Sequence, residues 1–169
     1  MVLLRGVNVG KHNRVAMADL RNVLAGIGAT DVTTYLQSGN AVVTAEPDGL
    51  ADRVEHALAE TLGLPVRVLV RTTGDLRTVV DANPFPDKVA TPKLLHVAFL
   101  EHEPDPAVVD TFGLRQGSDE IALGDRALYL SYQTRSFDSP INEVLNRLPG
   151  AWTTRNWTTV TKLLELAEA

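Results

Sequence analysis

The alternation of hydrophobic and polar positions divides the chain into short strands and amphipathic helices. Apolar runs rich in β-branched residues indicate strands, and apolar residues that recur every three or four positions indicate helices. In the first half these patterns predict a strand at 2–9, a helix at 16–27, strands at 32–37 and 40–44, a helix at 49–62 and a strand at 66–71. The order β-α-β-β-α-β is that of the ferredoxin-like split βαβ arrangement, in which two helices cover one face of an antiparallel sheet.

The second half repeats this order in part. After a short helix at 75–81, the patterns predict a strand at 94–100, a helix at 106–112, hairpin strands at 120–123 and 126–132, and helices at 140–148 and 156–167. Asp105 and Ser139 support two of these helix starts, because each is a capping residue followed by proline at the first helical position. The last helix takes the place of the strand that would complete a second copy.

We therefore expect an α+β fold in which a ferredoxin-like βαββαβ subdomain is followed by an incomplete βαββα subdomain and a C-terminal helix. The segment 83–92 carries three prolines and is the best candidate for a boundary. A boundary there divides the chain into two closely packed subdomains, residues 1–82 and 83–169. The alternative is one structural domain in which both halves share a single core.

Two hairpin turns follow from the same pattern. Ser38 and Gly39 form a predicted two-residue loop that makes Gln37 face Asn40. Gly124 and Asp125 form the predicted turn of the second hairpin.

Composition narrows the possible chemistry. The 169 residues include no cysteine, which excludes a thiol nucleophile, a disulfide framework, iron–sulfur clusters and cysteine-containing zinc sites. A net charge of −5 disfavours a general binder of nucleic-acid backbones. No apolar run approaches the roughly 20 residues of a membrane-spanning helix, and no signal region follows Met1. We expect a cytoplasmic protein that does not enter a membrane, and nucleic acid is disfavoured as its partner.

The cationic residues near the N-terminus are the main candidate chemistry. Between Met1 and Ala18 the chain carries Arg5, Lys11 and Arg14 but no acidic residue. The segment is not a phosphate loop of the nucleotide-binding type, because only three residues separate its glycines and His12 follows the lysine. A strand end with two glycines and cations before a helix N-terminus still suits an anion. The alternative is a turn with solvated charges.

Further residues join this candidate ligand site. Arg5 is predicted within a strand, where it either pairs with an internal carboxylate or awaits an anionic ligand. Gln37 and Asn40 could grip a polar group or stabilise the hairpin, and Arg155 is expected at an exposed helix start. The candidate ligand-binding residues are Arg5, Asn8, Lys11, Asn13, Arg14, Tyr35, Gln37, Asn40 and Arg155.

Other chemistry finds little support. The histidines lack metal-binding spacing, and Ser38 does not follow the pattern of a nucleophilic serine. We expect no metal and no cofactor, and the residues indicate no particular reaction.

Several motifs together resemble the domain of unknown function 1697 family. They are Leu4-Arg5-Gly6-Val7-Asn8-Val9-Gly10, Met17 with Leu20-Arg21, Thr34-Tyr35-Leu36-Gln37-Ser38-Gly39-Asn40, Asn83-Pro84-Phe85, and Arg155-Asn156-Trp157-Thr158-Thr159-Val160 followed by Lys162-Leu163. The resemblance covers nearly the whole chain and implies a two-subdomain α+β protein, with no activity attached. Lys11 and Ala16 depart from the family pattern, which usually has Gly and often Pro there, so the loop after Gly10 is expected to differ.

Three classes of function follow from these observations. The leading hypothesis is a protein that binds a small phosphate- or carboxylate-bearing ligand near the N-terminal strand and loop. The alternative is a protein-interaction or homodimer module that uses the open face of the sheet. RNA binding ranks third, because the strand at 40–44 lacks the aromatic residues that stack on bases.

Overall fold

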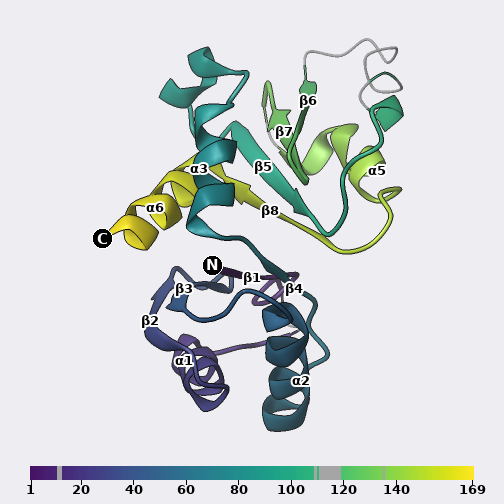
Figure 1. The fold of residues 1–169 in the computed structure, drawn as a ribbon. Helices are drawn as coiled ribbons and strands as arrows, with labels where there is room; N and C mark the ends of the chain where they lie inside the picture. The colour runs from purple at the N-terminus through teal and green to yellow at the C-terminus, as the bar shows by residue number, and fades with distance from the viewer. Residues whose placement is uncertain (11–12, 109, 111–118, 135) are drawn as a thin grey trace. The chain divides into compact units, whose positions relative to one another are not determined.

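The computed structural model describes residues 1–10, 13–108, 110, 119–134 and 136–169 (Figure 1). It has the α+β class that the hydrophobic pattern predicts, with two antiparallel four-stranded sheets. The chain forms two compact units: unit 1 is Met1–Gly74 with Leu163–Ala169, and unit 2 is Asp75–Lys162.

Unit 1 contains one sheet with two helices on one face. Its elements are β1 (Val2–Leu4), α1 (Met17–Gly26), β2 (Thr30–Tyr35), β3 (Asn40–Thr44), α2 (Leu50–Leu62) and β4 (Val68–Val70). The strand order is β2-β3-β1-β4, and each neighbouring pair is antiparallel. Leu20 of α1 and Leu58 of α2 join the same core cluster as Val2 and Leu4, so both helices pack on that face of β1 (Figure 1).

Unit 2 repeats this strand order. Its elements are α3 (Thr73–Asp81), η1 (Pro86–Ala90), β5 (Leu95–Leu100), β6 (Glu120–Gly124), β7 (Ala127–Ser131), η2 (Ser136–Asp138), α5 (Ile141–Leu145), β8 (Trp152–Asn156) and α6 (Trp157–Glu168), of which α3 begins and α6 ends in unit 1. The sheet has the order β6-β7-β5-β8. Ile141 and Leu145 of α5 pack with Leu100 and Leu130 in the core of this unit.

The prediction of an incomplete second copy is wrong, because β8 completes the second sheet. Its five residues pair with β5, from Trp152 opposite Leu100 to Asn156 opposite His96. The buried positions of β8 are Thr153 and Arg155, which are polar, so the strand carries no alternation of apolar residues. Only its pairing with β5 makes this segment a strand.

Several predicted boundaries also change. β1 ends at Leu4 rather than at residue 9, so Arg5 lies beyond the strand and is exposed. Tyr35 pairs with Asn40, which places Gln37 in a longer turn at 36–39 and not opposite Asn40. The predicted elements at 32–37, 66–71 and 140–148 are likewise shifted or shorter.

The second hairpin turns one residue later than predicted. Gly124 pairs with Ala127, so Asp125 and Arg126 form the turn. The helix predicted at 106–112 lies partly outside the described residues, and positions 107, 108 and 110 are helical.

Candidate functional site

Two loops of unit 1 are fastened to each other by Asn8. The first joins β1 to α1 and is described at residues 5–10 and 13–16, and the second, residues 36–39, joins β2 to β3. These described residues are together called the two-loop surface. Asn8 Nδ2 donates to the carbonyl oxygens of Val15 at 2.8 Å and Gln37 at 2.6 Å. Asn8 Oδ1 accepts the Val15 N–H at 3.0 Å. The side-chain amide of Asn8 therefore ties the two loops to each other.

The backbone of the two-loop surface contains a concentration of left-handed conformations. Positive φ angles occur at Gly6, Asn8, Gly10, Asn13, Leu36 and Gly39. Leu36 is the unusual member, because a φ of 56° costs a residue with a side chain roughly 1–2 kcal/mol. Backbone strain of this kind gathers at ligand clamps and active sites, which makes the two-loop surface the candidate functional site.

Gly39 allows the second loop to lie against β1. A Cβ atom there would be 2.6 Å from both Leu4 Cβ and Val7 Cγ2. The Leu4 N–H donates to the Gly39 carbonyl at 2.8 Å, which closes the contact between this loop and the strand.

Exposed side chains of two kinds project from these loops. Val9 and Leu36 are 70% and 55% exposed and are the two most exposed large hydrophobic residues described. Arg5, Arg14 and Gln37 belong to the same two loops and are also exposed. Within the described residues, the Arg14 guanidinium makes no hydrogen bond or ion pair. The surface therefore combines cationic and aliphatic groups.

Arg67 is a further cation near these loops, and it pairs with an acidic residue. The Arg5 N–H donates to the Arg67 carbonyl at 2.9 Å, so the two residues are neighbours. Arg67 Nε lies 3.0 Å from Glu55 Oε1, which also accepts the Val68 N–H. Glu55 neutralises Arg67, whereas Arg14 keeps its charge for solvent or a ligand.

Asn40 and Asn13 have roles within the loops themselves. Asn40 is fully buried, and its Nδ2 donates to the Tyr35 carbonyl and Ser38 Oγ, both at 2.9 Å. The Asn13 carbonyl accepts the Asn8 N–H at 3.0 Å. Tyr35 is half-buried at the end of β2, and Lys11 lies outside the described residues. These contacts match the hairpin alternative for Asn40.

Arg155 belongs to unit 2 and is buried, which corrects the exposed position predicted for it. It lies on β8 opposite Val97, and its Nη1 donates to Thr153 Oγ1 and the Thr154 carbonyl, both at 2.7 Å. Burial lowers the pKa of the Arg155 guanidinium to about 10. The strand β8, which the hydrophobic pattern does not predict, is the reason for this error.

The sequence points to the cations of the two-loop surface but not to its aliphatic residues. The hydrophobic pattern places Val9 and Leu36 in two strands, where apolar residues are ordinary. The signal that could have found Leu36 is a large apolar residue beside the polar turn that follows it.

The fold and the two-loop surface define an α+β protein of two similar units, of which the first carries an exposed cationic and aliphatic loop pair. The chain belongs to the family described as "Protein of unknown function (DUF1697)", whose model matches residues 1–129. The match includes both loops and ends before the motif that begins at Arg155.

A solved structure shares the fold. The conserved bacterial protein SP0830 from Streptococcus pneumoniae superposes with a TM-score of 0.72 at 22% sequence identity, over 98% of this chain and 96% of that one. No curated protein matches the chain.

The described residues contain neither a membrane span nor a metal-ligand cluster. No helix among them is long and apolar enough to cross a membrane. Likewise, no group of three or more metal-ligating side chains occurs in the part of the chain that the structure describes.

Proposed function

We propose that the two-loop surface binds a small ligand that carries a phosphate or carboxylate group. The observation that supports this most is the fastening of both loops by Asn8, whose hydrogen bonds to Val15 fix the backbone next to Arg14. An ordered site binds more tightly than a mobile one, because less conformational entropy is lost on binding. Arg5 and Arg14 would supply the donors for the anion.

The charge of this region supports an anionic ligand. The first acidic residue of the chain is Asp19, after Arg5, Lys11 and Arg14, although the whole chain has a net charge of −5. Guanidinium groups suit phosphate and carboxylate because their N–H donors match the geometry of these anions.

Magnitudes indicate that the ligand also has an apolar part. A charge-assisted hydrogen bond contributes about 1.5–3 kcal/mol, whereas association costs about 4–15 kcal/mol. Two arginine contacts therefore give weak binding by themselves. Val9 and Leu36 offer the apolar surface whose burial would supply the remainder.

Thermal unfolding at constant ionic strength tests the proposal. Pyrophosphate, citrate and phosphorylated aliphatic alcohols are titrated, and the midpoint of unfolding is measured for the wild type, Arg5→Ala and Arg14→Ala. Lys93→Ala is the matched control, because it removes an exposed cation of unit 2 that belongs to neither proposed site. We expect the anions to raise the midpoint of the wild type and the control, and to do so less in both loop variants.

Two results would contradict the proposal. One is that no anion raises the midpoint. The other is that Arg14→Ala responds to every anion as Lys93→Ala does.

We further propose that the protein acts in the cytoplasm. The absence of cysteine supports this only indirectly, since such a chain needs no oxidising compartment to mature.

A further inference from the structure

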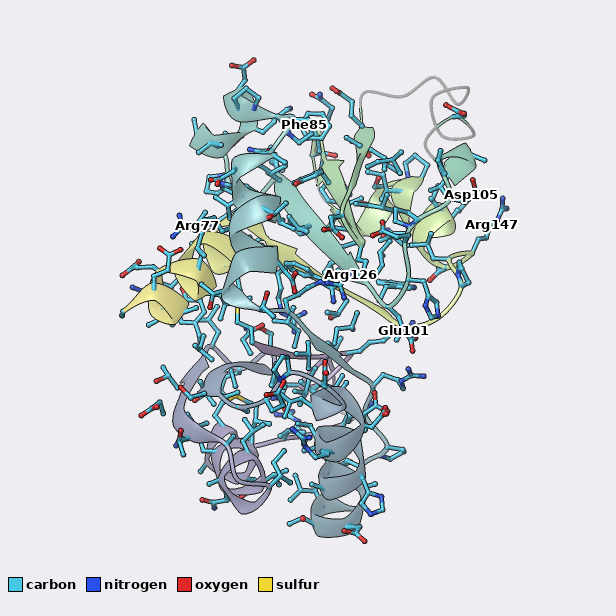
Figure 2. All side chains as sticks on the ribbon, viewed as in Figure 1. Arg77, Phe85, Glu101, Asp105, Arg126 and Arg147 are labelled. Atoms are coloured by element: carbon cyan, nitrogen blue, oxygen red, sulfur yellow. The ribbon has the colours of Figure 1, made fainter. Side chains whose placement is uncertain are left out.

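A cavity of about 400 Å³ lies in unit 2, away in sequence from the two-loop surface. It is lined by the segment around Asp105 and Val108 and by the last turn of α5 with the residues after it, Val144, Arg147 and Leu148. Asp105 and Arg147, both labelled in Figure 2, line the same cavity. The volume falls within the range of about 300–1,000 Å³ that is usual for small-molecule sites.

The wall of this cavity is aliphatic. Val108, Val144 and Leu148 are partly buried and pack against the core cluster of unit 2. An apolar group that entered the cavity would extend this core and remove aliphatic surface from water. The wall therefore selects a ligand with a hydrocarbon body.

The rim of the cavity carries two opposite charges that do not pair with each other. Within the described chain, the Arg147 guanidinium has no hydrogen-bond or ion-pair partner. Asp105 Oδ1 accepts the Ala107 N–H at 2.9 Å, and its carboxylate has no cationic partner among the described residues. Two charges of opposite sign beside one apolar cavity suit a ligand that carries both complementary charges.

We propose that this cavity binds a free amino acid with a large apolar side chain, such as leucine or phenylalanine. The ligand carboxylate pairs with Arg147, its ammonium group pairs with Asp105, and its side chain packs on Val108, Val144 and Leu148. A purely anionic ligand would be repelled by Asp105, and a purely cationic one by Arg147. The proposal is independent of the anion site on unit 1.

Isothermal titration of the full chain compares four probes that differ by one feature each. Leucine carries both charges and the side chain, isocaproate lacks the ammonium group, isoamylamine lacks the carboxylate, and glycine lacks the side chain. We expect leucine to bind, and isocaproate and isoamylamine to bind about tenfold more weakly or not at all, since a charge-assisted bond is worth at least that factor. Glycine should also bind more weakly, because it leaves the aliphatic wall of the cavity exposed to water.

Variants then assign the charges. Arg147→Ala should weaken leucine binding about tenfold or more. Asp105→Asn keeps the oxygen that accepts the Ala107 N–H, so the local backbone stays capped while the charge is lost, and it should weaken leucine but not isocaproate. Lys93→Ala, an exposed cation of unit 2 that belongs to neither proposed site, is the control and should bind leucine as the wild type does.

The proposal fails if leucine does not bind, or if it binds equally to the wild type and Arg147→Ala. It also fails if isocaproate binds as tightly as leucine and Asp105→Asn has no effect, which would indicate a site for apolar carboxylic acids instead. Because the anion site is tested through Arg14, failure of one proposal leaves the other unaffected.

Discussion

At the scale of single residues, Gly39 and Leu36 show opposite uses of the same backbone conformation. Both have positive φ angles within the turn between β2 and β3. Position 39 requires glycine, because Leu4 and Val7 occupy the space that a Cβ would fill. Leu36 has a side chain that this conformation disfavours, and that side chain faces solvent.

Gly39→Ala should destabilise unit 1 strongly. The new methyl group would meet Leu4 Cβ and Val7 Cγ2 and would also suffer the positive φ. We expect a loss of about 3 kcal/mol or more in the free energy of unfolding, as the sum of backbone strain and overpacking. Gly6→Ala is the matched control, because Gly6 also has a positive φ but no atom within 4 Å of its Cβ position. Urea unfolding that gave equal losses for the two variants would refute the packing argument.

Leu36→Gly should stabilise the protein while weakening the ligand site. Glycine adopts a φ of 56° without steric cost, whereas its greater entropy in the unfolded chain opposes folding. Because the relief of strain is the larger effect, the free energy of unfolding should rise, by at most about 1 kcal/mol. The proposed apolar contact with the ligand is lost at the same time. Chemical unfolding and anion titration are measured on the same variant. An increase in stability with unchanged ligand affinity would remove Leu36 from the proposed site.

At the scale of elements, Tyr129 joins β7 to α3 within unit 2. Its side chain is buried, and its hydroxyl donates to the Val79 carbonyl at 2.8 Å. Burial, with a smaller contribution from Asp125, raises the pKa of Tyr129 from 10.0 to about 12. The neutral hydroxyl is therefore required for the contact between these two elements.

This pKa shift predicts a loss of stability in alkali. An unfolded tyrosine ionises near pH 10 while the folded one does not, so the contribution of Tyr129 is complete below pH 10 and is lost between about pH 10 and 12. Its share of the slope is at most about 1.4 kcal/mol per pH unit. Arg155, whose pKa burial lowers to about 10, acts in the opposite direction over the same range.

Tyr129→Phe isolates the effect of this hydroxyl. At pH 7 the variant should be less stable by about 1 kcal/mol, because the Val79 carbonyl loses its donor. From pH 10 upward its stability should fall less steeply than that of the wild type, and Arg155 is present in both proteins. Parallel curves of unfolding free energy against pH would disprove the assignment.

At the scale of the whole molecule, charge is distributed unevenly along the chain. The first eighteen residues are cationic while the complete chain has a net charge of −5. Exposed charges attract ligands through solvent, and at about 0.1 M salt this attraction is screened beyond roughly 10 Å. The two proposed sites should therefore respond differently to salt.

Anion affinity at the two-loop surface should fall several-fold when sodium chloride is raised from about 0.05 to 0.5 M, because exposed arginines are screened. Leucine affinity in unit 2 should change less, since that ligand has no net charge. Titration of both ligands across this range checks the difference. Equal salt dependence of the two affinities would argue against an electrostatic origin for the anion site.

The hydrophobic pattern was sufficient for α1 and α2 because each helix carries its own signal. Leu50, Val54 and Leu58 recur every four residues, and Gly63 ends α2 with a φ of 66°. The order of elements along unit 1 and the α+β class follow from such local periodicity. The cationic character of the first loop is likewise a property of composition alone.

Only the tertiary structure decided the second sheet and the form of both candidate sites. β8 is a strand because β5 pairs with it, and its polar residues give no periodic signal. Asn8 orders the two loops through Gln37, which is distant in sequence. The cavity in unit 2 needs both Val108 and Leu148. Local periodicity is written into neighbouring residues, whereas pairings between distant segments depend on how the whole chain folds.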